Sequence, residues 1–355
     1  MNVSRMRRAV LASAASALLL AGCSDANKTA ANPGEAASGT CKGESFRIAK
    51  ASPSFVYLPF YVAEGGKFFE HEGLVPETVE VHTGAGIVAA AVSGSVDVAM
   101  VTAGEVYVAS AEGAPVQAFA QVSNLGTNIV AKQSLLDERG ITAESTDEER
   151  LALLKGSRIA VTGSGSGTDQ LIRYMAKAGG FDPDKDMEII ATGSGGNSVS
   201  GFTSGRFDII AISSPQSDIA IREGQGAYLF DIAHGDYKPL ADNLYITAMA
   251  SERTIAQRPA MLECLTAALG DALELIQNDP GKSAELARPL MGNIDPEIFS
   301  AAFESNRPSW PATPAINRDN AESALDFQNK FLAEPLSADV LDAAINPEIA
   351  EAAKK

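Results

Sequence analysis

Positive charge is scarce in this sequence of 355 residues, which holds 28 Lys and Arg against 45 Asp and Glu and has a formal net charge of −17. Nucleic acids are bound through clustered Lys and Arg, and no cluster of that kind occurs. We therefore expect no nucleic-acid partner. The excess of acidic residues favours a soluble protein.

Histidine is also rare, and the three that occur, His71, His82 and His234, show no metal-ligand spacing such as His-Glu-x-x-His. No Gly-x-Ser-x-Gly hydrolase elbow is present, and the glycine-rich stretch 163–168 lacks the Gly-Lys-Ser/Thr of a phosphate loop. These absences predict a protein that is not an enzyme and has no metal or cofactor. We expect His82 and His234 to be hydrogen-bonded structural residues, with ligand contact the alternative for His234.

Long apolar runs are missing except near the N-terminus, where three arginines precede the stretch Ala9–Ala21 and Leu20-Ala21-Gly22-Cys23 follows. A basic segment, a short apolar segment and small residues before a cysteine indicate a secretory signal, and the run is short for a membrane span. It resembles the bacterial lipoprotein signal, which implies lipidation, for example with palmitate, at Cys23. We predict a signal peptide at 1–22 and a flexible tether at 23–43, which is rich in small and polar residues.

Cysteine is limited to three residues. If Cys23 carries a lipid, Cys41 and Cys264 remain as an even pair in an oxidising compartment. We predict a disulfide between them, with two separate buried thiols as the alternative.

Glycine, by contrast, is abundant. Gly163-Ser164-Gly165-Ser166-Gly167-Thr168 lies between the apolar run Arg158–Val161 and an amphipathic run that begins at Asp169. Free backbone N–H groups at a helix N-terminus favour anionic or polar ligands, so this loop is a candidate ligand cradle. An ordinary strand-to-helix connection is the alternative.

The surroundings of this loop occur twice in the chain. The strand around Arg47 recurs around Arg158, and the Ser-Gly-x-x-Asp pattern ending at Asp97 recurs at Asp208, both 111 residues later. Between them, Thr83–Gly86 matches Thr192–Gly195. This repeat predicts an α/β protein with two lobes, each a largely parallel sheet flanked by helices, and ligand contacts beyond the carboxyl ends of the strands. We expect Asp97 and Asp208 to fix turns rather than touch ligand.

Two segments, Gln121–Leu125 and Asn243–Thr247, are predicted to cross between the lobes and to act as a hinge. The predicted first lobe comprises 44–122 and 248–355, including the whole helical tail, and the second comprises 123–247.

Several motifs resemble solute-binding proteins of ABC importers, in the branch serving nitrate, sulfonates such as taurine, aromatic acids and thiamine precursors. They are Ser52–Ala63, Gly66–Phe69, Glu72–Leu74 and Lys155–Val161 running into Gly165–Thr168. The resemblance spans about 46–355. It implies a type II periplasmic-binding fold, a protein exported to the periplasm or the outer face of the cytoplasmic membrane, and permease and ATPase partners. We expect a lipid-anchored monomer.

The resemblance also implies a ligand-binding set rich in hydroxyl groups and aromatic rings. Its members are Ser54, Phe55, Tyr57, Thr102, Ser164, Ser166, Thr168, Ser213, Ser214 and Trp310. For the aromatic residues, core packing is the alternative. The nearest cations, Lys50, Lys67 and Arg173, are expected to be solvated or helix-face charges, which leaves the charge of the ligand open.

The predicted function is capture of a small polar or anionic organic solute, such as a sulfonate or aromatic carboxylate, for import. The alternative is a scavenger of pyrimidine- or thiamine-like precursors, or a sensory binding protein without a direct import role.

Overall fold

The computed structural model describes residues 41–51, 53–81 and 83–353. The predicted signal peptide, the lipidation site Cys23 and most of the predicted tether lie outside the described residues, as do Ser52 and His82. Those predictions therefore stay predictions.

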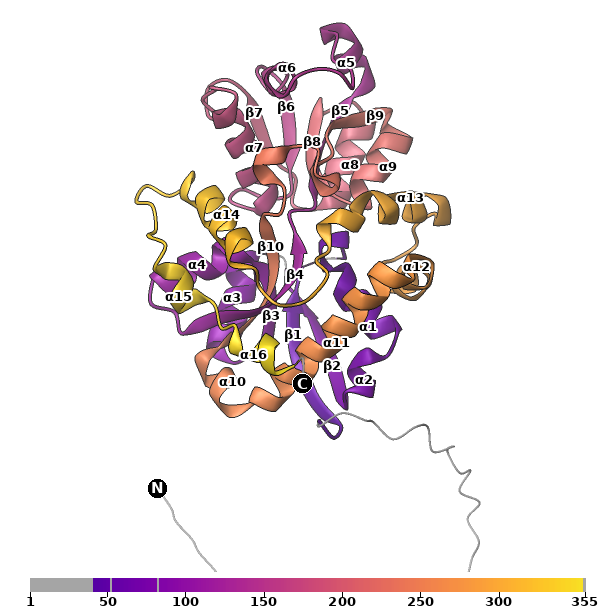
Figure 1. The fold of residues 1–355 in the computed structure, drawn as a ribbon. Helices are drawn as coiled ribbons and strands as arrows, with labels where there is room; N and C mark the ends of the chain where they lie inside the picture. The colour runs from indigo at the N-terminus through magenta and orange to yellow at the C-terminus, as the bar shows by residue number, and fades with distance from the viewer. Residues whose placement is uncertain (1–40, 52, 82, 354–355) are drawn as a thin grey trace, which may run out of the picture. The chain divides into compact units, whose positions relative to one another are not determined.

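Two five-stranded sheets organise the described residues (Figure 1). The first has the order β2-β1-β3-β10-β4, with β1 (Glu44–Lys50), β2 (Leu74–Glu80), β3 (Val98–Thr102), β4 (Val116–Asn124) and β10 (Leu244–Ser251). The second has the order β7-β6-β8-β5-β9, with β5 (Thr127–Lys132), β6 (Arg158–Val161), β7 (Glu188–Ala191), β8 (Ile209–Ser213) and β9 (Gly226–Phe230). The two orders correspond strand for strand, which is the outcome that the sequence repeat predicts.

Each sheet contains one strand that runs against the others. β1 pairs in parallel with β2 and β3, and β6 pairs in parallel with β7 and β8. β10 is antiparallel to both of its neighbours, and so is β5. These two strands come from the other sheet and not from a crossover within their own sheet, so they are free to enter in the opposite direction.

The two crossings between the sheets lie side by side. The chain leaves the first sheet after β4 and returns into β10 through the short helices η2 (Ile232–His234) and η3 (Lys238–Leu240). Asn124 pairs with Leu244, and the Leu125 N–H donates to the Asn243 carbonyl over 2.9 Å. The predicted lobe boundary at 247/248 falls within β10.

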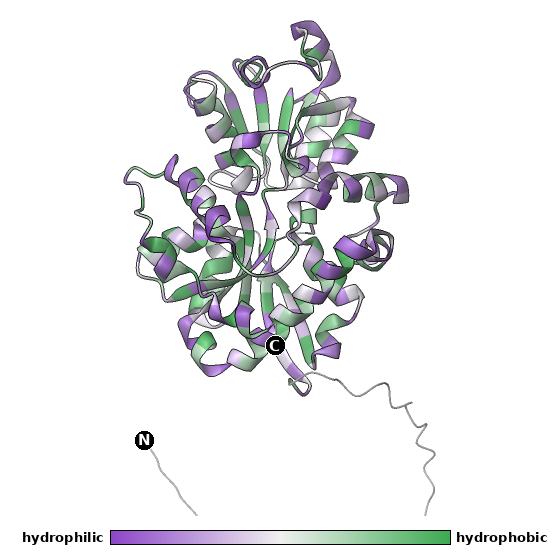
Figure 2. Cartoon of the chain, in the orientation of Figure 1, coloured by the Kyte–Doolittle hydropathy of each residue, from purple (hydrophilic) through white to green (hydrophobic). Residues whose placement is uncertain are grey.

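Helices cover the faces of both sheets, and their apolar sides turn toward the strands (Figures 1 and 2). Around the first sheet are α1 (Leu58–Gly65), α2 (Phe68–His71), α3 (Gly84–Ser93), α4 (Ala103–Ala111), α10 (Glu252–Gln257), α11 (Pro259–Asn278), α12 (Pro280–Ala287), α15 (Val340–Ala344) and α16 (Glu348–Ala352). Around the second are α5 (Gln133–Arg139), α6 (Asp147–Ala152), α7 (Gly167–Ala178), α8 (Gly195–Thr203) and α9 (Gln216–Gly224). The tail also contains α13 (Pro296–Asn306) and α14 (Arg318–Asn329).

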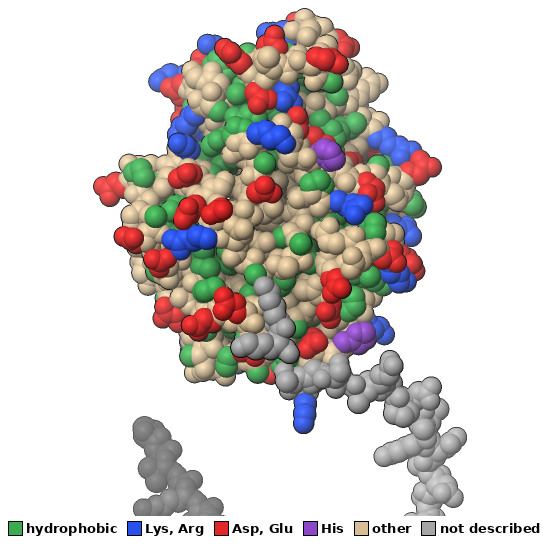
Figure 3. Space-filling model, viewed as in Figure 1, with side chains coloured by type: hydrophobic (Ala, Val, Ile, Leu, Met, Phe, Trp, Pro, Cys, Tyr) green, Lys and Arg blue, Asp and Glu red, His purple; other side chains and the backbone are tan. Residues whose placement is uncertain are grey.

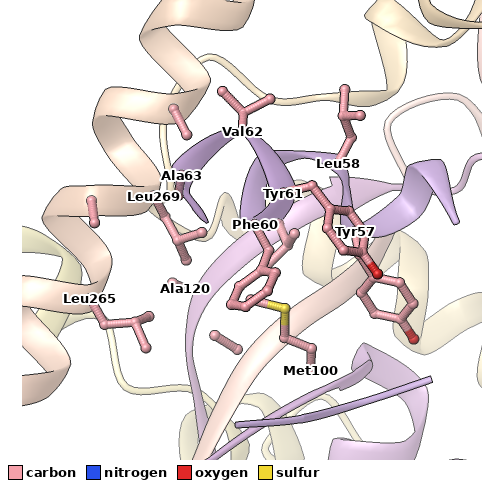
Figure 4. Close-up of a cluster of buried hydrophobic side chains, with 14 of the residues drawn as sticks. Tyr57, Leu58, Phe60, Tyr61, Val62, Ala63, Met100, Ala120, Leu265 and Leu269 are labelled. Carbon is pink, nitrogen blue, oxygen red and sulfur yellow. The ribbon is translucent and has the colours of Figure 1, made fainter. Parts of the chain in front are cut away.

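The largest apolar cluster lies between the first sheet, α1 and α11 (Figure 4). Leu262, Leu265, Leu269 and Leu273 recur every three or four residues along α11 and are fully buried, as one face of a helix should be. In Figure 4 the Phe60 ring of α1 points toward Met100 of β3. This packing fixes α1, and with it the turn that leads out of β1.

We predicted that the whole tail belongs to the first lobe, and in the structure α13 and α14 also contact elements of the second half. Asn306 of α13 donates to the Ser214 hydroxyl over 2.7 Å, and Ser305 donates to Asp231 over 3.0 Å. The Phe327 ring of α14 packs 5.1 Å from that of Tyr174 in α7. Both helices present side chains to the second sheet's elements, so the tail bridges the two halves.

Asp97 and Asp208 fix equivalent turns, as predicted. The Arg47 N–H donates to Asp97 over 2.8 Å, and the Arg158 N–H donates to Asp208 over 3.0 Å. Each carboxylate thereby ties the start of a repeat's third strand to its first.

Cys41 and Cys264 form a disulfide in the structure, with Cα atoms 6.5 Å apart, within the usual range for such a bond. It joins the segment before β1 to α11.

Candidate functional site

The predicted ligand hydroxyls of the glycine-rich loop are engaged within the loop itself. Ser166 is the N-cap of α7, and its hydroxyl donates to the Gly163 carbonyl over 2.7 Å. Thr168 is buried, and its oxygen accepts the Thr162 N–H over 2.9 Å. Ser164 is exposed. These bonds make the loop a preformed turn in the described state.

A carboxylate of the chain accepts a hydrogen bond from one of the loop's N–H groups. The Gly165 N–H donates to Asp169 over 2.8 Å, and Asp169 also pairs with Arg173 over 3.1 Å. The N-terminus of α7, which the sequence suggested as an anion cradle, thus already holds an internal anion.

Four of the predicted residues meet where the sheets approach one another. The Phe55 N–H donates to the Ser214 carbonyl over 2.9 Å, and the Ser54 hydroxyl approaches the same oxygen at 3.4 Å. The Trp310 indole N–H donates to the Phe55 carbonyl over 3.0 Å. Phe55 and Trp310 are both buried and pack against the aromatic residues of α13. In this arrangement, they form the seam between the halves and carry little accessible surface.

Beside this seam lies a group that we name the inter-sheet cluster: Tyr57, Glu105, Thr127, Ser213 and Tyr245. The Thr127 and Ser213 hydroxyls are 3.0 Å apart, and Thr127 also hydrogen-bonds the Tyr245 hydroxyl. Tyr57 comes from the turn after β1, and Glu105 from α4, whereas Thr127 and Ser213 come from the second sheet. The cluster therefore joins polar groups from both halves.

Thr102, another predicted ligand residue, holds Glu105 in place. Its hydroxyl donates to Glu105 Oε2 over 2.7 Å, and its N–H reaches the same oxygen at 3.3 Å. In return the Glu105 N–H donates to the Thr102 hydroxyl over 3.3 Å, which completes the capping box of α4. A side chain at Gly84 would place its Cβ 1.5 Å from Glu105 Oε1, so it would force the carboxylate to move.

Burial perturbs the ionisable groups of the cluster. It raises the pKa of Glu105, an effect that the hydrogen bonds from Thr102 oppose. Burial raises the pKa of Tyr245 to about 12, and it raises that of Tyr57 further, assisted by the charges of Tyr245 and Glu105. Both phenols are consequently neutral hydrogen-bonding groups near neutral pH.

The nearby cations differ from expectation in one case. Lys50 was predicted to be solvated, but it is only 4% exposed, and its ammonium donates to the Tyr61 hydroxyl over 2.6 Å. Burial lowers the pKa of Lys50. The prediction failed because Lys50 occupies an inward position of β1, in step with Phe46 and Ile48. Lys67 is exposed, and Arg173 pairs with Asp169 and Asp184 on the surface of α7, as predicted.

The space around Tyr245 of the cluster is tightly filled. A Cβ at Gly167 of α7 would lie 2.2 Å from the Tyr245 oxygen. Thr102, Gln170 and Tyr245 border a hollow of about 10 Å³, enough for about one water molecule. A solute larger than water therefore needs the halves to separate before it can enter at this point.

Sequence reasoning missed Glu105, Thr127 and Tyr245. A signal existed for Glu105, because Thr102-x-x-Glu105 is a capping-box pattern that follows a strand. Tyr245 lay within a predicted crossing, but no pattern identified its side chain as facing the other sheet.

Other features bear on the class of site. In residues 41–51, 53–81 and 83–353, no group of three or more His, Cys, Asp or Glu side chains could hold a metal ion. His234 is exposed, and its ring nitrogen lies 3.3 Å from the Ser305 carbonyl. None of the helices that the structure describes is long and apolar enough to span a membrane. Acidic side chains, with basic ones between them, are spread over the face seen in Figure 3.

Comparison with known proteins identifies a matching family model and a similar sequence. Residues 52–291 match the model of the NMT1-like family. The chain is 24% identical over 300 residues to YtlA of Bacillus subtilis (strain 168), which is named as a binding protein; the alignment covers 82% of this chain and 85% of YtlA.

Two solved structures share the fold. The alkanesulfonate-binding protein SsuA from Xanthomonas axonopodis pv. citri, bound to MOPS, matches with a TM-score of 0.66 and 18% identity over 86% of this chain and 99% of SsuA. The ligand-binding component of an ABC-type import system from Staphylococcus aureus matches with a TM-score of 0.68 and 13% identity over 87% of this chain and 98% of that chain. The two-sheet architecture is therefore that of the periplasmic binding proteins.

Proposed function

Because the chain belongs to the NMT1-like family, we propose that it is the substrate-binding component of an ABC importer, which captures a small organic solute between its two sheets. The observation that carries the proposal is the inter-sheet cluster, where polar groups from the strand ends of both halves converge. Ligands of open α/β sheets bind beyond the carboxyl ends of the strands, which is where these groups lie. The names of SsuA and of the Staphylococcus aureus protein support the same class.

The mechanism follows from contacts made by both halves. A solute that touches both sheets binds the closed arrangement more tightly than the open one, and so shifts the population toward closure. The paired crossings next to Asn124 and Leu244 serve as the hinge. The bond from Phe55 to Ser214 is a contact that closure forms and opening breaks.

Delivery requires export and a place at the membrane. We assign export to the signal peptide at 1–22 and membrane anchorage to a lipid on Cys23. The tether at 23–43 then lets the folded part of the protein extend from the membrane to the permease. The partners are then the permease and the ATPase of the importer, met by a monomeric binding protein.

A thermal-shift screen tests solute capture, because a ligand that binds only the folded protein raises its melting temperature. The panel contains sulfonates, nitrate, aromatic carboxylates, pyrimidines and amines. Calorimetry with the best solute then compares the wild type with Thr127→Val, which removes one hydroxyl of the cluster, and we expect a loss of about 1 kcal/mol. Thr203→Val, at an exposed position of α8, is the matched control. Equal affinity in all three proteins places the site elsewhere.

A scavenging or sensory role is the second candidate, because the same capture serves both. Uptake of the labelled solute by cells with and without the gene separates them. Loss of uptake on deletion supports import, and undiminished uptake supports the second role.

A further inference from the structure

We infer that the solute is recognised through N–H donors, such as those of a protonated amine or an amidine, with the carboxylate of Glu105 as the acceptor. This inference rests on the proposed function, since it concerns the solute captured at the inter-sheet cluster. It narrows the polar or anionic solute predicted from the sequence to one that carries N–H donors.

The first argument is the state of the two Glu105 oxygens. Oε2 accepts both bonds from Thr102, whereas no hydrogen bond or ion pair joins Oε1 to any residue that the structure describes. Glu105 is partly buried. The backbone of Gly84, at the start of α3, lies against this carboxylate, since a Cβ there would be 1.5 Å from Oε1. A carboxylate held in place with one free oxygen is an acceptor prepared for a donor.

The second argument is the lack of competing positive charge. The described lysine and arginine side chains include none that pairs with Glu105. Lys50, the cation at the end of β1, donates to the Tyr61 hydroxyl. Because a carboxylate in a region of low polarity without a partner cation repels a second anion, a sulfonate or carboxylate group is disfavoured beside it.

The third argument concerns the neighbouring hydroxyls. The Ser213 hydroxyl can donate to Thr127, and Thr127 can then donate to Tyr245. In that arrangement the Tyr245 oxygen is held in place as an acceptor, and its own proton is directed away from Thr127. Tyr57 supplies a second neutral phenol. Neutral phenols accept N–H donors and also present apolar rings, which suits a small organic cation or a nitrogen-bearing ring.

The fourth argument removes the alternative anion site. In the loop before α7, the Gly165 N–H donates to Asp169, which is 3% exposed and paired with Arg173. An anionic ligand at this N–H would have to displace a carboxylate of the chain. One N–H of the loop that first suggested an anion is therefore already engaged.

The test uses solutes matched in shape and different in charge: benzamidine and benzylamine as cations, benzamide as the neutral donor, and benzoate and benzenesulfonate as anions. Agmatine, ethanesulfonate and nitrate extend the set to non-aromatic solutes. Binding is measured by thermal shift and calorimetry with the purified protein at pH 7.5. We expect the cations to bind at least tenfold more tightly than the matched anions, and Glu105→Gln to weaken the cations at least tenfold.

Glu112→Gln is the control, because Glu112 is an exposed carboxylate at the C-terminal end of the same helix. It should leave all affinities unchanged. Glu105→Asp keeps the charge and should recover part of the lost binding, which a merely structural role of Glu105 does not explain.

The outcomes separate the two proposals. If the anions bind best and Glu105→Gln leaves their affinity equal or improved, solute capture stands and the donor assignment is overturned. If no solute in the set or in a wider metabolite library binds, the proposed function falls, and this inference with it.

Discussion

At the scale of single residues, Glu105 links stability to pH. Burial raises its folded pKa above the unfolded value of about 4.3, so the protonated form is more favoured in the folded protein than in the unfolded chain. The stabilisation is full below the unfolded pKa and is lost as pH rises through the folded pKa. Glu105→Gln removes this loss, and glutamine can still complete the capping box. We therefore expect the variant to gain melting temperature over the wild type at pH 7, and the gain to shrink toward pH 4.

Thermal unfolding between pH 4 and pH 8 measures this difference, with Glu112→Gln as the reference. Tyr57 and Tyr245, the ionisable groups that interact with Glu105, have raised pKa values and do not titrate in this window. A pH-independent difference would contradict the account.

A second prediction at the scale of single residues concerns the close contact between Gly167 and Tyr245. Gly167→Ala places a methyl group 2.2 Å from the Tyr245 oxygen, which is itself bonded to Thr127. We expect the variant to lose about 1 to 3 kcal/mol of stability through overpacking. Tyr245→Phe removes the oxygen, so the loss should be much smaller in that background.

Gly196→Ala is the matched control, because the added Cβ meets no atom within 4 Å. It should be neutral or slightly stabilising. Denaturant unfolding of the single and double variants gives the coupling, and simple additivity would show that the two residues do not interact.

At the scale of elements, the serine hydroxyls that follow the strands serve first of all as helix N-caps. Ser166 caps α7 and Ser194 caps α8. Each Ser→Ala change should cost about 1 kcal/mol of stability. If the loop before α7 also touches solute, only Ser166→Ala should reduce affinity as well, and calorimetry on both variants decides this. Equal affinities would leave Ser166 with a structural role alone.

The same elements show what the sequence could and could not predict. The 111-residue offset correctly identified Arg47 with Arg158 and Asp97 with Asp208, because their bonds depend on local backbone geometry. The Thr-Gly-x-Gly motifs were matched two residues out of register, since the offset relates the caps Thr83 and Ser194.

The site was less predictable than the fold. Hydroxyl groups at strand ends suggested ligand contacts, yet the local bonds of Ser166 and Thr168 compete for them. Glu105 and Tyr245 approach each other through the antiparallel pairing of β3 with β10, in which Ile246 lies opposite Thr102. Contacts of that kind depend on tertiary packing, which no periodicity in a single sequence encodes.

At the scale of the whole molecule, the stabilising disulfide and the proposed binding site lie at opposite ends of the first sheet. The disulfide precedes β1, whereas the inter-sheet cluster lies beyond the other end of that strand. Seven residues of extended strand span about 20 Å. A change at the disulfide should therefore affect unfolding without altering the polar groups that face the solute.

Replacing Cys41 and Cys264 together with alanine tests this separation. The bond closes a loop of 223 residues in sequence separation, and its loss should lower the free energy of unfolding by about 2 to 5 kcal/mol, mainly because the unfolded chain gains freedom. Denaturant unfolding should show a lower midpoint, and wild-type protein with dithiothreitol should approach the variant. Solute affinity, measured by calorimetry below the melting transition, should remain within twofold of the wild type. A large loss of affinity in the folded variant would mean that the disulfide end of the sheet positions the binding site, and that the two ends of β1 are coupled.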